Sequence, residues 1–129
     1  MRSENVKPLL EVRGVQKHFH IRAAAGRPAG TLRAVDGVSL TLGAGETLGV
    51  VGESGCGKST LARLVVGLLE PTAGSIHIDG GDIWEPGEAG AKRRRNFQMV
   101  FQNPAGSMNP RRSVGASIAE PLWARGIRA

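Results

Sequence analysis

A glycine-rich stretch between an apolar segment and an amphipathic segment constrains this 129-residue chain more than any other feature. It runs from Gly52 to Thr60 and contains the pattern Gly-x-x-x-x-Gly-Lys-[Ser/Thr]. Its residues are Gly52, Glu53, Ser54, Gly55, Cys56, Gly57, Lys58, Ser59 and Thr60. Glycines let a backbone wrap closely enough for several N–H groups to reach phosphate oxygens together. The pattern therefore predicts a phosphate-binding loop that holds a nucleoside triphosphate.

The chemistry of the loop fits its residue types. Lys58 would bridge the outer phosphates, and the Ser59 hydroxyl would coordinate Mg²⁺. The helix expected after the loop points its N-terminus at the phosphates and adds unpaired donors. A glycine-rich turn that matches by chance is disfavoured, because an apolar strand is expected before the loop and an amphipathic helix after it. Cys56 could be a redox-sensitive thiol, but we favour a small side chain that fills a loop position.

The hydrophobic pattern predicts an α/β fold with a strand-rich segment before the loop. One helix is expected from the loop to residues 70–72, where Pro71 stops it, and another after a Ser113 cap. Turns are expected at residues 43–46 and 79–80, and a surface loop at 23–30. Strands are expected at residues 9–21, 34–42, 47–51, 75–78 and 97–102.

The chain carries a formal charge of +6, to which the run Lys92 to Arg95 contributes strongly. Such runs are usually solvated helix faces, so we expect no nucleic-acid partner. One cysteine allows no intrachain disulfide, and no apolar stretch approaches the roughly 20 residues of a membrane span. These features predict a soluble cytoplasmic protein. His18 and His20 share a strand face, but two histidines rarely form a metal site.

Taken with its neighbours, the loop resembles that of an ABC transporter ATPase subunit of the oligopeptide/dipeptide importer branch. The similar segments include Ala-Val-Asp-Gly-Val-Ser at 34–39 and Gln-Met-Val-Phe-Gln-Asn-Pro at 98–104. Further similar segments lie at residues 9–12, 45–51, 107–111 and 118–122. Their order and spacing together carry the resemblance.

The resemblance implies roles for two residues outside the loop. Gln102 matches the glutamine of the family's Q-loop, which reaches Mg²⁺, orients water and relays the nucleotide state to a membrane subunit. Phe19 matches the aromatic residue that stacks on adenine, although a core phenylalanine is the plain alternative. Asn103 stands where the family usually has an acid. Lys58 and Gln102 are thus the expected catalytic residues, and Ser59 and Gln102 the expected metal ligands.

The resemblance also implies an organisation and a setting. Residues 1–46 would form the side that holds the base, residues 47–103 the phosphate-loop core, and residues 104–129 the start of a helical subdomain. The expected cofactors are ATP and Mg²⁺. The expected partners are a second ATPase subunit and membrane permease subunits, at the cytoplasmic face of the plasma membrane.

Three motifs of such ATPases do not occur in these 129 residues: the signature Leu-Ser-Gly-Gly-Gln, the Walker B acid pair and the switch histidine. The sequence therefore reads as an N-terminal fragment of one ATPase domain that cannot hydrolyse ATP alone. Two alternatives are open. One is a different phosphate-loop ATPase or kinase, and the other is a non-catalytic gene remnant.

Overall fold

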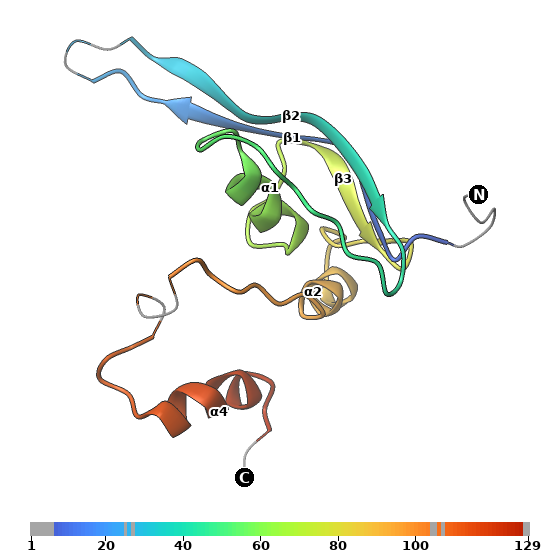
Figure 1. Ribbon diagram of the computed structural model, residues 1–129, viewed down its shortest axis with the longest axis vertical. Helices are drawn as coiled ribbons and strands as arrows, with labels where there is room; N and C mark the ends of the chain where they lie inside the picture. The colour runs from blue at the N-terminus through green and yellow to red at the C-terminus, as the bar shows by residue number, and fades with distance from the viewer. Residues whose placement is uncertain (1–6, 25, 27, 104–105, 107, 128–129) are drawn as a thin grey trace. The chain divides into compact units, whose positions relative to one another are not determined.

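A computed structural model describes residues 7–24, 26, 28–103, 106 and 108–127, which form two compact units, Met1–Gln98 and Met99–Ala129. Figure 1 shows their helices and strands. The first unit contains β1 (Leu10–Ile21), β2 (Gly30–Leu42), α1 (Lys58–Val65), β3 (Ala73–Ile78), β4 (Gly81–Asp82) and α2 (Glu88–Arg94). The second unit contains α4 (Val114–Ala124).

The strands of the first unit form one antiparallel sheet in the order β2-β1-β3-β4. In Figure 1, β1 and β2 run side by side as two long ribbons. A bulge around Gly14, which has a φ of 53°, adds a residue to β1, so that Val12 and Val15 both lie in the core. The strands expected at 9–21, 34–42 and 75–78 are therefore confirmed.

The core is aliphatic, as a chain with only 4% aromatic residues requires. It joins the sheet to α1 through Leu64, which is fully buried. Its members are Leu10, Val12, Val15, Val35, Leu64, Ile76, Ile78 and Ile83. This packing fixes α1 against the sheet, and the loop leads directly into this helix.

Helix α1 ends earlier than the sequence predicted. Gly67 adopts a φ of 72°, its N–H donates to the carbonyl of Leu64, and the N–H of Leu68 donates to the carbonyl of Arg63. These bonds form the glycine-based stop of the Schellman type. The helix therefore ends at Val65, and the prediction that it continues to residues 70–72 is wrong.

The β3–β4 turn and the basic run form one packed corner. Asp79 and Gly80 both have positive φ and close the predicted two-residue hairpin turn. Arg93 of α2 donates to the Asp82 carbonyl at 3.2 Å and pairs with Glu85. It is half-buried, so the expectation that the basic run is a solvated face is wrong at this position.

Arg94, the next residue of α2, also contacts the β3–β4 corner. It donates to the Ile83 carbonyl, and its guanidinium lies 4.7 Å from the centre of the Trp84 ring. Its aliphatic stem packs so closely against Gly67 that a Cβ there would lie 2.7 Å from it. Arg94 therefore holds the end of α1 and the hairpin together.

Two expected strands are not formed. Residues 47–51 and 97–102 have no strand assignment, and Val50 and Val51 expose 51% and 94% of their surface. A buried parallel strand needs hydrogen-bonding neighbours. Within the part of the chain that the structure describes, no strand pairs with either segment. The prediction of strands at residues 47–51 and 97–102 is therefore wrong.

In the second unit, Ser113 caps α4 as predicted, accepting a hydrogen bond from the Ala116 N–H at 3.2 Å. Pro121 lies inside the helix without ending it. Val114, Ile118 and Leu122 share a face and are exposed. Among the described residues, no helix is long and apolar enough to cross a membrane.

Candidate phosphate-binding site

The loop leads directly into the first turn of α1. Gly57 precedes the helix with a φ of 98°, a conformation that L-residues with side chains rarely adopt. Its carbonyl accepts the first helical bond, from the Leu61 N–H at 2.8 Å. Glycine at position 57 is therefore what lets the chain turn from the loop into the helix.

Two glycines of the pattern are held where a side chain does not fit. A Cβ on Gly57 would overlap the backbone carbonyl oxygen of Ala34 in β2. A Cβ on Gly52 would lie 2.7 Å from Cys56 Sγ and 4.0 Å from Lys58 Nζ. At Gly57 the loop therefore packs against β2. At Gly52 it packs against the side chains of Cys56 and Lys58, which belong to the loop itself.

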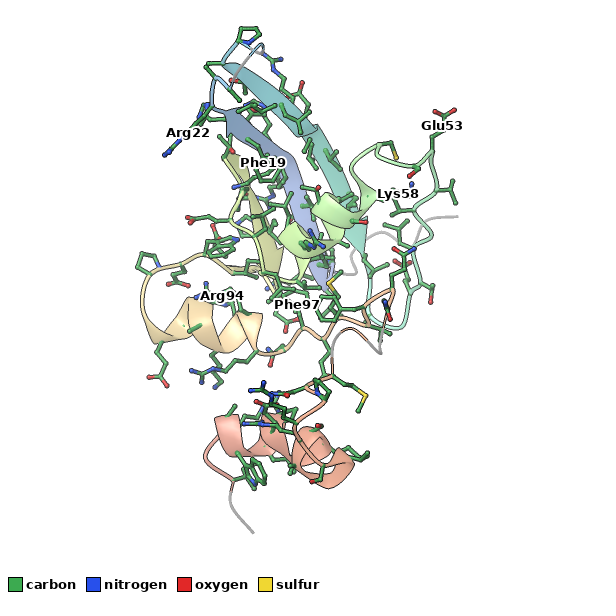
Figure 2. All side chains as sticks on the ribbon, turned by 90° about the vertical axis from the view of Figure 1, so that its left-hand side faces the viewer. Phe19, Arg22, Glu53, Lys58, Arg94 and Phe97 are labelled. Carbon is green, nitrogen blue, oxygen red and sulfur yellow. The ribbon has the colours of Figure 1, made fainter. Side chains whose placement is uncertain are left out.

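Lys58 turns back into that interior. Its Nζ donates to the carbonyl oxygens of Gly52 and Glu53, both at 2.6 Å, and lies 3.5 Å from Cys56 Sγ. Figure 2 shows Lys58 at the start of α1 and Glu53 on the neighbouring loop. Charged phosphate oxygens form stronger hydrogen bonds with an ammonium group than neutral carbonyls do. The ammonium of Lys58 can therefore exchange its hydrogen bonds to the two loop carbonyls for hydrogen bonds to phosphate oxygens.

The first turn of α1 offers further donors to an anion. Ser59 is exposed and Thr60 is half-buried in this turn, and no acidic residue lies in it. The first N–H groups of a helix have no partner within the helix, and they carry the positive end of its dipole. With the close-packed glycines and Lys58, this turn fits a phosphate chain.

A pocket of about 380 Å³ adjoins the loop. Its walls come from β2, including Arg33 and Asp36, and from the loop, including Gly57 and Lys58. Arg33 and Asp36 lie 3.5 Å apart as an ion pair. Sequence reasoning did not single out these two residues, because only the register of β2 places them beside the loop.

Phe19 lies outside the buried core and exposes 38% of its surface. The pairing of β1 with β2 shifts register between Val15 and Lys17 and again between Lys17 and His18, and the Lys17 ammonium lies 5.5 Å from the centre of the Phe19 ring. The plain alternative, a core phenylalanine, is contradicted.

The other residues of interest separate into distinct places. His18 Nε2 lies 3.6 Å from Asp36 Oδ1, and among the described residues no three His, Cys, Asp or Glu side chains form a metal-binding group. Gln102 is exposed and belongs to the second unit. The structure thus brings the nine loop residues together, while the approach of Gln102 to them is a matter for proposal.

Comparison with known proteins identifies a family that the chain matches. The family model described as ABC transporter matches residues 35–124. The chain is 48% identical to the oligopeptide transport ATP-binding protein AppF of Bacillus subtilis, a match that covers 95% of the chain. It is 45% identical to the dipeptide transport ATP-binding protein DppF of Escherichia coli, over 90% of the chain. It is 47% identical to the oligopeptide transport ATP-binding protein OppF of Salmonella typhimurium, over 92% of the chain.

These matches cover 38%, 35% and 37% of the three relatives. The chain therefore spans a little over a third of the length of the curated relatives it matches. The family model matches more than two thirds of the chain and includes the whole loop and α1. The chain therefore belongs to the ABC transporter family.

Proposed function

We propose that this chain binds MgATP as part of the ATP-binding subunit of a peptide importer. The observation that carries this proposal is the position of Lys58, whose Nζ lies 2.6 Å from two loop carbonyls inside a loop that side chains at Gly52 and Gly57 would obstruct. This arrangement supplies a positive charge, a helix N-terminus and close backbone approach in one place.

Each site residue has a role in this proposal. Lys58 moves from the carbonyls of Gly52 and Glu53 to the outer phosphates, and backbone N–H groups from Gly52 to Thr60 hold the remaining oxygens. Ser59 and Gln102 offer oxygen ligands to Mg²⁺, which prefers oxygen and keeps several waters. Phe19 stacks on the adenine base. Mg²⁺, when bound, neutralises charge on the phosphates.

The importer function is supported by what the relatives are named for, oligopeptide and dipeptide transport. The working assembly then contains a second ATPase subunit and membrane permease subunits, with this protein peripheral at the cytoplasmic face of the membrane. In this assembly the loop is one half of a composite ATP site, and the partner supplies the other half.

Peptide uptake tests the importer function in cells that carry this gene. Lys58→Ala in the chromosomal copy should abolish uptake of a labelled di- or oligopeptide, because the outer phosphates lose their cation. Lys92→Ala is the matched control, since Lys92 is an exposed lysine on α2. Uptake that is unchanged in Lys58→Ala, at equal protein levels, would refute the importer function.

A further inference from the structure

Lys17 is a half-buried lysine on β1 whose ammonium is fixed at two sides. Its Nζ donates to the Glu70 carbonyl at 2.7 Å. It also lies 5.5 Å from the centre of the Phe19 ring, within the range of a cation–π contact. The family resemblance gives this residue no role, and its position two residues before Phe19 is the sequence signal that places the two side chains near each other.

The position of Lys17 follows from the sheet. Lys17 lies on β1 between Val15, which is in the core, and Phe19, which is partly exposed. Glu70 follows directly after the hydrogen-bonded turn that ends α1. The loop leads into the other end of the same helix. Lys17 therefore connects the ring of Phe19 to the same helix that carries Lys58.

We propose that Lys17 is a positioning residue that holds the ring of Phe19 ready to stack on the nucleotide base. This inference rests on the proposed function, in which Phe19 stacks on adenine. An exposed phenylalanine on a strand has several rotamers, and ordering one of them on binding costs free energy. A cation anchored to a backbone carbonyl and seated against the ring reduces that cost before the base arrives.

The role predicts an effect on the base and none on the phosphates. A cation–π contact at a partly exposed site is worth about 0.5–1 kcal/mol, which corresponds to about two- to fivefold in affinity. Lys17→Met keeps the aliphatic stem and removes the charge. We therefore expect Lys17→Met to weaken MgATP binding about two- to fivefold and to leave magnesium tripolyphosphate binding unchanged.

The experiment is a ³¹P NMR titration of the protein with each of these two ligands, since the same signal reports both. Phe19→Ala should weaken MgATP alone, and Lys17→Met should add nothing once Phe19 is absent. Lys17→Arg, which keeps a cation that can lie over the ring, should restore most of the affinity. Circular dichroism confirms that each variant is folded.

Lys7→Met is the matched control, because Lys7 Nζ also donates to a backbone carbonyl, that of Asp79 at 3.0 Å, at another place on the sheet. It should change neither affinity. Equal weakening of both ligands in Lys17→Met would show that Lys17 attracts phosphate, and this would overturn the proposal. An effect that persists in the Phe19→Ala background would overturn it as well.

The titration also separates this proposal from the function on which it rests. Wild-type protein that binds neither ligand refutes the phosphate site, and the role of Lys17 falls with it. Wild-type protein that binds both ligands, with Lys17→Met indistinguishable from wild type on MgATP, refutes the role of Lys17 alone.

Discussion

Strand β3 and residues 47–51 are both short apolar segments next to a turn, yet only β3 forms a strand. Ile76 of β3 is fully buried, whereas Val51 is 94% exposed. β3 pairs with β1 and β4 in antiparallel fashion, and its turn to β4 takes two residues. Residues 47–51 read as a strand covered on both faces, and such strands pair in parallel with partners reached by long crossovers.

The difference shows that apolar character sets the tendency to form a strand, while a neighbour decides whether the strand forms. An antiparallel partner can lie a turn away in the sequence, but a parallel partner cannot. The loop is nevertheless well formed after the unpaired segment, because Gly57 packs on β2 and α1 packs on the core. The proposed phosphate site therefore depends on the antiparallel sheet.

Replacement of one side chain in each segment by alanine should give the largest difference in stability. Ile76→Ala should lower the free energy of unfolding by about 2–5 kcal/mol, because it leaves a cavity in the core. Val51→Ala should change it by less than about 0.5 kcal/mol, because the side chain is already in solvent. Urea denaturation followed by circular dichroism measures both. A cost above about 1 kcal/mol for Val51→Ala would show that residues 47–51 are buried in solution.

The dependence of the loop on β2 is tested by a pair of glycines. Gly57→Ala combines a positive φ with overlap of the Ala34 carbonyl, so it should cost about 2–4 kcal/mol and weaken nucleotide binding. Gly55→Ala shares the positive φ but meets nothing within 4 Å, so it should cost about 1–2 kcal/mol. Equal costs, from the same denaturation experiment, would mean that the contact with β2 does not hold the loop.

The smallest expected effect concerns Arg94, which contacts Ile83, Trp84 and Gly67 at the C-terminal end of α1. Arg94→Ala should cost about 1–3 kcal/mol, since it removes a charged donor to Ile83 and the contact with Trp84. Lys92→Ala, on the same helix and exposed, should be nearly neutral. Thermal unfolding measures both variants. An equal loss of stability in the two would contradict the claim that Arg94 holds the end of α1 and the hairpin together.

Much of the fold could be predicted from local sequence. Alternation gave β1 to β3, and Asp79 with Gly80 gave the hairpin, because these signals act over a few residues. The stop of α1 at Gly67 has a local signal, a glycine after an apolar stripe, whereas Pro71, the stop expected from the sequence, lies beyond the end of the helix. The roles of Arg93 and Arg94 could not be predicted, because a charge run does not reveal which carbonyls and rings lie within its reach.

The residues from Gly52 to Thr60 predict a phosphate-binding loop because they are continuous in sequence, and phosphate binding by this loop stays a prediction. The contact of Gly57 with Ala34 could not be predicted, since it depends on how β2 passes the loop. Lys17 was missed for a related reason. Its partner Phe19 was singled out as an isolated residue, and the ring contact needs the strand geometry of β1.

The most direct test of the phosphate site is the affinity of the purified protein for MgATP, measured by isothermal titration calorimetry with wild type and Lys58→Ala. Loss of a charged hydrogen-bond donor to the phosphates should weaken binding by about tenfold or more. Lys92→Ala should bind as wild type does. MgATP affinity that is the same in wild type and in folded Lys58→Ala would contradict the assignment of this loop as the phosphate site.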